Sequence, residues 1–91
     1  MLNSTHIKNE SKVHQLPQHL KYLFWDTDFE SLRLDSNIEE IVTRIIMYGD
    51  DESYKFLFKN IDMSTIKYII NSEREIDDIT RNYWNLVFAK Q

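Results

Sequence analysis

The sequence predicts an all-α fold, a compact bundle of four to five short helices. Large apolar side chains recur at the three- and four-residue spacing of a single helix face. The chain also has only one glycine and one proline in 91 residues, which leaves little turn-forming sequence for the hairpins of a sheet. Its many isoleucines favour strands, but the spacing and the helix-capping residues outweigh that propensity.

The first expected helix begins at Pro17, because the N–H that proline lacks would have no partner at the first helical position. The apolar residues around it share one side: Leu16, Leu20, Leu23 and Phe24. A turn through Asp26–Asp28 is expected to end this helix.

The clearest helix is predicted after Ser36, whose hydroxyl would cap it while Glu39 reaches back in a capping box. Its buried face consists of residues at helical spacing: Ile38, Ile41, Val42, Ile45 and Ile46. We expect Gly49 to end the helix in the left-handed conformation. Asp50 is then expected to cap the next helix.

The remaining helices follow from the same two signals. The helix after Asp50 is expected to end near Asn60, and its inward residues are Tyr54, Leu57, Phe58 and Ile61. A fourth, started by Asp62 or Ser64, would bury Met63, Ile66, Ile69 and Ile70. A final helix, capped by Asp77 or Asp78, is predicted to point inward with Ile79, Tyr83, Leu86, Val87 and Phe88.

Length and composition indicate one domain. Domains usually run to roughly 100–150 residues, so the chain should hold one core. Residues 1–15 are polar and aperiodic and are expected to form a flexible leader, with residues 16–91 as the helical domain. The absence of cysteine favours a reducing, cytoplasmic location. No segment approaches the roughly 20 apolar residues of a membrane span, so no membrane is expected as a partner.

The charge pattern argues against nucleic acid. Beyond Lys21 the sequence holds 8 basic and 14 acidic residues, and no run or stripe of cations occurs. Because phosphate binding depends on clustered Lys and Arg, we do not expect nucleic acid as a partner.

Asp26 and Asp28 form the sharpest chemical motif, since carboxylates two residues apart can share a divalent cation or divide catalytic roles. An EF-hand loop would need glycine and glutamate where the chain has Ser31 and Asn37. A cap or turn role is therefore favoured. The three histidines, all at or before His19, suit neither a metal site nor a nucleophilic triad, so we predict no catalytic residue, metal or cofactor.

The tryptophans are the strongest signal for a binding surface. Trp25 and Trp84 fall outside the simple inward stripes, and tryptophan and arginine are enriched at binding hot spots. Trp84 could form such a patch with Arg81 and Asn82, but a small bundle could also bury both tryptophans. The sequence leaves core and interface open for each of them.

Several short aromatic and acidic blocks occur in a fixed order: Leu23-Phe24-Trp25-Asp26, Asp28-Phe29, Tyr48-Gly49-Asp50, Leu57-Phe58 and Thr80-Arg81-Asn82 with Trp84, Leu86 and Phe88. In this order the chain resembles, over roughly residues 16–89, a small bacterial "Phe-Trp-Asp" family that is often encoded beside abortive-infection nucleotidyltransferase toxins. The resemblance implies an antitoxin-like or accessory role. The chain departs from the family where Asp77-Asp78-Ile79-Thr80 replaces the usual Ser-Pro-Lys-Thr, although an Asp cap can substitute for Ser. Its polar leader is also longer.

The leading prediction is therefore a non-enzymatic protein-binding module, antitoxin-like, with a toxin of the nucleotidyltransferase type as partner. The candidate partner-binding residues are Trp25, Asp26, Asp28, Arg81, Asn82 and Trp84. The alternative is a helical DNA-binding autoregulator that would use the last helix. A homodimer is also compatible with the surplus of aromatic residues. A metal-dependent hydrolase at Asp26 and Asp28 is the least favoured.

Overall fold

A computed structural model describes residues 16–90, so the predicted leader over residues 1–15 lies outside the described part of the chain. Within these residues two 3₁₀-helices and four α-helices follow one another: η3 (Gln18–Phe24), η4 (Phe29–Ser31), α1 (Ile38–Tyr48), α2 (Asp51–Asn60), α3 (Met63–Ser72) and α4 (Asp78–Ala89). No strand occurs among the described residues. The predicted all-α bundle of short helices is thus confirmed.

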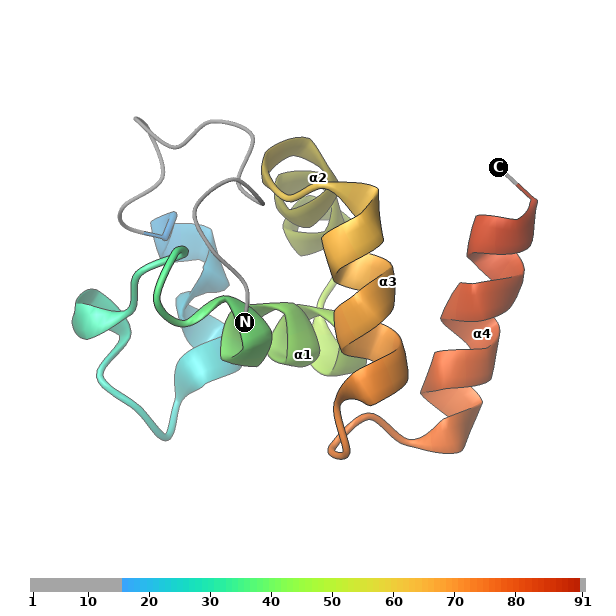
Figure 1. Cartoon of the computed structure of the whole chain (residues 1–91). Helices are drawn as coiled ribbons and strands as arrows, with labels where there is room; N and C mark the ends of the chain where they lie inside the picture. Colours follow the sequence, from blue (N-terminus) through green and yellow to red (C-terminus); the bar gives the residue numbers. More distant parts are fainter. Residues whose placement is uncertain (1–15, 91) are drawn as a thin grey trace.

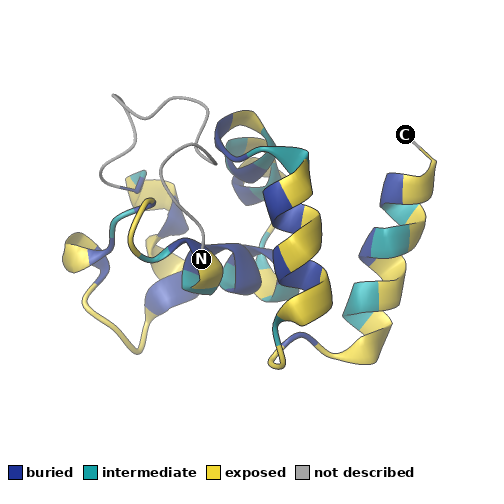
Figure 2. Cartoon of the chain, viewed as in Figure 1, coloured by how far each residue is buried: buried dark blue, intermediate teal, exposed yellow. Residues whose placement is uncertain are grey.

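Helix α1 lies at the centre of the bundle. It crosses the middle of the molecule and packs against η3, α2 and α3, while α4 stands beyond α3 and packs against it (Figure 1). The buried apolar residues of all these elements form one cluster (Figure 2). Fully enclosed members include Leu20, Leu23, Ile41, Ile45, Leu57, Ile66 and Ile69. The predicted inward faces of η3, α1 and α3 supply most of this core.

Three aspartates begin three of the α-helices. Asp50 forms a capping box with Ser53: the Asp50 carboxylate accepts from the Ser53 backbone N–H at 3.0 Å, and the Ser53 hydroxyl accepts from the Asp50 N–H at 2.8 Å. Asp62 caps α3, and Asp77 caps α4. The structure therefore confirms Asp50, and it selects Asp62 rather than Ser64 for α3 and Asp77 rather than Asp78 for α4.

The predicted capping box of Ser36 and Glu39 is wrong. Helix α1 begins one residue later, after Asn37, and no side chain caps its first turn. The Asn37 side chain instead accepts a hydrogen bond from the Arg33 backbone N–H at 3.0 Å, and the Ser36 hydroxyl bonds to Asp35. The Ser36 hydroxyl, which the capping pattern assigned to the helix, is thus used within the preceding loop.

Gly49 ends α1 as predicted, but not in the left-handed conformation. Its backbone is extended, with φ −75° and ψ 175°. A Cβ at this position would collide with the Ser53 hydroxyl and lie 2.5 Å from the Ile45 carbonyl oxygen. Glycine is therefore required because the capping box of α2 closes directly over the last turn of α1.

The predicted inward face of α4 is partly wrong. Phe88 is buried and Val87 packs against the core, as predicted, but Ile79, Tyr83 and Leu86 are 84%, 59% and 63% exposed, and Trp84 is buried in their place. Figure 2 shows the exposed positions of α4 on the side that faces away from α3. Trp84 and Phe88 turn inward because they pack on the Phe58 ring, with centroid distances of 5.8 and 6.4 Å.

Candidate binding site around Trp25 and Arg44

Arg44, on α1, holds the segment that follows η3. Its guanidinium binds both oxygens of the Asp26 carboxylate, at 2.7 Å from one nitrogen and 2.9 Å from the other. It also donates to the Leu23 carbonyl oxygen at 2.9 Å. Only 17% of the Arg44 side chain is exposed. This bidentate geometry fixes the position of the chain between η3 and η4 relative to α1.

Trp25 lies over this ion pair and is largely open to solvent. The Arg44 guanidinium carbon lies 5.1 Å from the centre of the Trp25 ring, a cation–π distance. The edge of the Tyr48 ring meets the indole, with centroids 6.4 Å apart. Trp25 nevertheless remains 71% exposed. The indole is thus a large apolar surface that two neighbours hold in place.

The electrostatics of the ion pair follow from these contacts. The hydrogen bonds from Arg44 lower the pKa of the Asp26 carboxyl below its ordinary value. The same hydrogen bonds raise the pKa of Arg44. Both groups are therefore charged throughout the neutral range.

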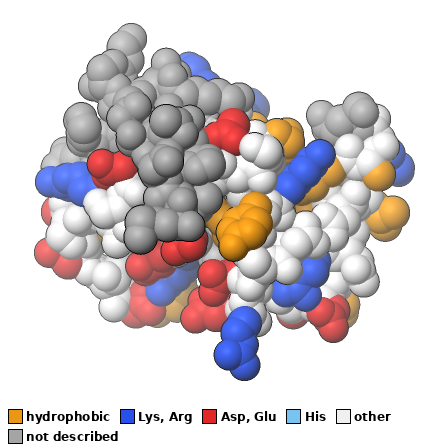
Figure 3. Space-filling view, viewed as in Figure 1, with side chains coloured by type: hydrophobic (Ala, Val, Ile, Leu, Met, Phe, Trp, Pro, Cys, Tyr) orange, Lys and Arg blue, Asp and Glu red, His pale blue; other side chains and the backbone are white. Residues whose placement is uncertain are grey.

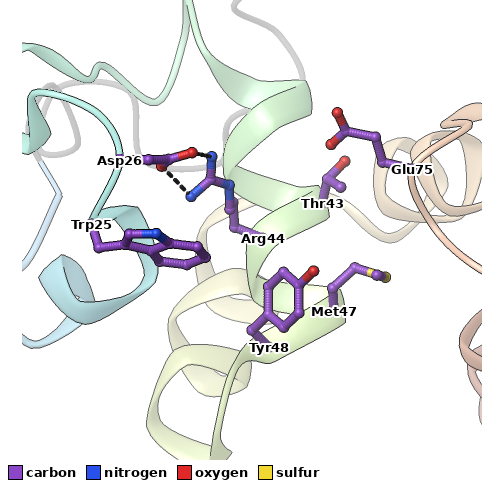
Figure 4. Close-up of a pocket in the computed structure, with 7 residues that line it drawn as sticks. All are labelled: Trp25, Asp26, Thr43, Arg44, Met47, Tyr48 and Glu75. Carbon is purple, nitrogen blue, oxygen red and sulfur yellow. Dashed lines mark hydrogen bonds and ion pairs between the residues drawn. The ribbon is translucent and has the colours of Figure 1, made fainter.

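Two adjoining pockets open beside the pair. The first, with a volume of about 240 Å³, is lined by Trp25, Asp26, Thr43, Arg44, Met47, Tyr48 and Glu75 (Figure 4). The second, of about 360 Å³, shares Thr43, Arg44 and Glu75 with it and is further lined by Glu39, Glu40 and Glu73. In Figure 4 the Arg44 guanidinium points toward Asp26, while Thr43 and Glu75 lie on the opposite side of it. The first pocket has an aromatic wall, whereas the second is acidic.

The structure places the predicted site residues in different parts of the fold. Trp25 and Asp26 adjoin one another at the pocket, as described. Asp28 is exposed at the start of η4 and lines neither pocket; its backbone carbonyl accepts from the Ser31 hydroxyl at 2.8 Å. Asn82 is exposed on α4, and Trp84 is 7% exposed and belongs to the core.

Arg81 is a structural residue in this fold. Its guanidinium donates to the backbone carbonyls of Ile70, Glu73 and Ile76 at 3.0, 3.1 and 2.7 Å, and it pairs with Asp78. These bonds tie the end of α3 and the following connection to α4. The Arg81 guanidinium, which the sequence assigned to an Arg81–Trp84 binding patch, is therefore engaged by backbone carbonyls and by Asp78 within the fold.

Sequence reasoning missed Arg44 and Tyr48. Arg44 is the only cation of α1, and it stands four residues after Glu40, which is a pattern of a solvent-exposed ion pair. Its main partner, however, is Asp26, 18 residues earlier. Only the packing of η3 on α1 shows that pairing.

The described residues include neither a metal-binding cluster of side chains nor a membrane-spanning helix. No group of three or more His, Asp or Glu side chains within residues 16–90 lies close enough together to hold a metal ion. None of the helices formed by these residues is both long and apolar enough to cross a bilayer.

Of three comparisons with known proteins, only the comparison with protein families gives a match. Neither the curated proteins nor the solved structures contain a significant match to the chain. Residues 19–70 match a family of unknown function, DUF6922. The matched segment includes Trp25, Asp26, Arg44 and Tyr48 and ends before Arg81 and Trp84. Because it covers more than half of the 91 residues, the chain belongs to the DUF6922 family.

Proposed function

We propose that this chain is a non-enzymatic protein-binding domain whose contact surface is centred on Trp25. The observation that carries the proposal is the exposure of a fixed indole: Trp25 is 71% exposed although Arg44 and Tyr48 hold its ring. Tryptophan is enriched at binding hot spots. A side chain that is already ordered loses less conformational entropy when a partner covers it.

A second apolar surface supports a protein partner. Ile79, Tyr83 and Leu86 lie at helical spacing on the outer face of α4, and each is more than half exposed. Such a stripe is the kind of face that an amphipathic helix buries against a groove or another helix. A partner that covers it would bury apolar area in addition to Trp25.

The resemblance to the "Phe-Trp-Asp" proteins supports a more specific proposal. We infer an antitoxin-like role in the bacterial cytoplasm, with a nucleotidyltransferase-type toxin as the partner. The acidic chain would bind this toxin directly and without catalysis. The partner would be encoded by the neighbouring gene.

Co-expression of the full chain with the product of its neighbouring gene tests the proposal. We expect a stoichiometric complex to be retained on affinity purification. Trp25→Ala should weaken the complex about tenfold or more by calorimetry, because it removes the central aromatic contact. Tyr68→Ala is the matched control, since Tyr68 is an aromatic residue of similar exposure, 60%, on α3. A missing complex, or equal effects of the two substitutions, would contradict the proposal.

A further inference from the structure

Helix α4 leaves an apolar stripe open along its outer face. Ile79, Tyr83 and Leu86 follow one another at spacings of four and three residues, which place them within one narrow arc of the helix. Their side chains are 84%, 59% and 63% exposed. Figure 3 shows hydrophobic side chains along the right edge of the molecule, where α4 lies. The stripe is therefore apolar area that residues 16–90 leave largely uncovered.

An apolar pocket adjoins this stripe near the end of α4. It has a volume of about 230 Å³, and only apolar side chains line it: Phe58, Met63, Trp84, Val87 and Phe88. Val87 is half-buried and follows Tyr83 by four residues, so it lies next to the stripe, at the edge of the pocket. Because an apolar cavity of about 150 Å³ accommodates benzene, this pocket can take a branched aliphatic side chain.

The stripe and the pocket complement one another about a two-fold axis at Tyr83. Ile79 precedes Tyr83 by four residues, and Val87 follows it by four residues. When two α4 helices lie antiparallel with the axis at Tyr83, Ile79 of each copy meets Val87 of the other copy, beside the pocket. Such a contact uses the same surface of both chains and closes as a dimer.

The charges of α4 favour the antiparallel direction. Asp77 and Asp78 stand at the start of the helix, whereas Lys90 stands at its end. Antiparallel packing brings Lys90 of one copy toward the acidic start of the other and opposes the two helix dipoles. Parallel packing would instead gather the aspartates of both copies at one end. The charge pattern of α4 is thus complementary to itself, which identifies a second copy of this chain as the occupant.

We propose that the outer face of α4 pairs with the same face of a second copy, antiparallel about Tyr83, with Ile79 of each copy seated at the apolar pocket of the other. Three exposed side chains per copy bury less than the roughly 800 Å² per partner of a standard interface, so the dimer is weak and depends on concentration. The α4 stripe is thereby assigned to self-association, and Trp25 is left to a different protein. The dimer does not rest on the proposed function.

Sedimentation velocity of the full chain alone, between about 5 and 500 µM, tests the dimer. We expect the sedimenting species to change from one chain to two across this range. Ile79→Ser should weaken the dimer about tenfold or more, whereas Tyr68→Ser, which changes a 60% exposed ring on α3, should not. Thermal melting checks that both variants are folded. A single chain at every concentration, or equal effects of the two substitutions, would overturn the proposal.

Cysteine cross-linking tests the direction of pairing, because the chain has no cysteine of its own. A mixture of the Ile79→Cys and Val87→Cys proteins should oxidise to a mixed dimer, since antiparallel packing brings these two positions together. The Ile79→Cys protein alone should not, because the two copies of position 79 then lie about 12 Å apart along the helices, beyond the roughly 7 Å between Cα atoms that a disulfide spans. Equally fast cross-linking of Ile79→Cys with itself would overturn the antiparallel arrangement.

These results are distinct from those of the partner experiment. If the chain alone stays monomeric while a Trp25-dependent complex forms, the α4 dimer is wrong and the proposed function stands. If the chain dimerises with the expected dependence on Ile79 but no partner is retained, the dimer stands and the proposed function fails. If the chain alone is monomeric and Ile79→Ser abolishes the complex with the neighbouring gene product, the stripe belongs to that partner and the dimer is wrong.

Discussion

Arg44 binds both carboxylate oxygens of Asp26, which lies 18 residues earlier in the chain. This ion pair is the main polar link between α1 and the segment after η3, and it determines where Trp25 stands. The pair is close to the surface, with 17% of the Arg44 side chain and 49% of the Asp26 side chain exposed. Its contribution to stability therefore comes from geometry and hydrogen bonding more than from charge attraction.

Arg44→Met should lower the free energy of unfolding by about 1–2 kcal/mol, because the apolar stem is kept while the bonds to Asp26 and the Leu23 carbonyl are lost. Urea unfolding followed by circular dichroism measures this change. Lys55→Met is the control, since Lys55 is an exposed cation on α2 that forms no ion pair with any residue the structure describes. Equal stability of the two variants would show that the Asp26–Arg44 pair does not position this segment.

Acid should destabilise the fold below the ordinary pKa of aspartate. Hydrogen bonds lower the pKa of Asp26, through Arg44, and of the two caps Asp50 and Asp77, through the backbone N–H groups of Ser53 and Thr80. A carboxyl with a lowered pKa binds its proton more weakly in the folded than in the unfolded state. Its stabilising effect is complete above the unfolded value, 3.8, and is lost as the pH falls from there through the folded pKa.

Thermal melting between neutral pH and about pH 2.5 measures this loss, which spans the aspartate range. Asp77→Asn is the informative variant, because Asn caps helices about as well as Asp but does not titrate. It should match the parent chain near neutral pH and lose less stability in acid. A pH profile identical to that of the parent chain would contradict a titrating role for the Asp77 cap.

Arg81→Met should loosen α4 without removing a partner contact. The substitution leaves the carbonyls of Ile70, Glu73 and Ile76 without their charged donor, and we expect a loss of about 2 kcal/mol. Hydrogen exchange should accelerate most in α4 and at the end of α3. Asn82→Ala, at the exposed neighbouring position, should leave both stability and exchange unchanged. If Asn82→Ala has the larger effect, the structural assignment of Arg81 is wrong.

The sequence predicted those parts of the fold that local pattern determines. Helix α1 has a single apolar face, so its isoleucines could only point inward. The caps Asp50 and Asp77 bond to the backbone N–H three residues later, so they depend only on the local sequence. Helix α4 was different, because Ile79, Tyr83 and Leu86 and also Trp84 and Phe88 have helical spacing. Which residues of α4 turn inward depends on the helices against which α4 packs. The Phe58 ring on α2 contacts Trp84 and Phe88, and these two residues are therefore buried.

The candidate site was predictable only in part, for a related reason. Trp25 stood out because it lay off the inward stripe, and the structure leaves it exposed. Arg44 belongs to another helix, so its contacts with Asp26 and Trp25 depend on how η3 packs across α1. Thr43 shows no sequence signal at all, because its missing hydrogen-bond partner is a property of the packed interior.

The two tryptophans should respond in opposite ways to the same substitution. Trp84 is 7% exposed and packs against the rings of Tyr54, Phe58 and Phe88, so Trp84→Ala should cost about 3–5 kcal/mol and leave a small domain barely folded. Trp25→Ala removes an exposed ring and should change stability by about 1 kcal/mol or less. Urea unfolding measures both values, and acrylamide quenching gives an independent check. The fluorescence of the Trp25→Ala protein comes from Trp84 alone and should be poorly quenched, whereas the parent chain retains an accessible indole. Strong quenching of the Trp25→Ala protein in its folded state would place Trp84 at the surface and remove the distinction between core and interface on which the proposed binding surface depends.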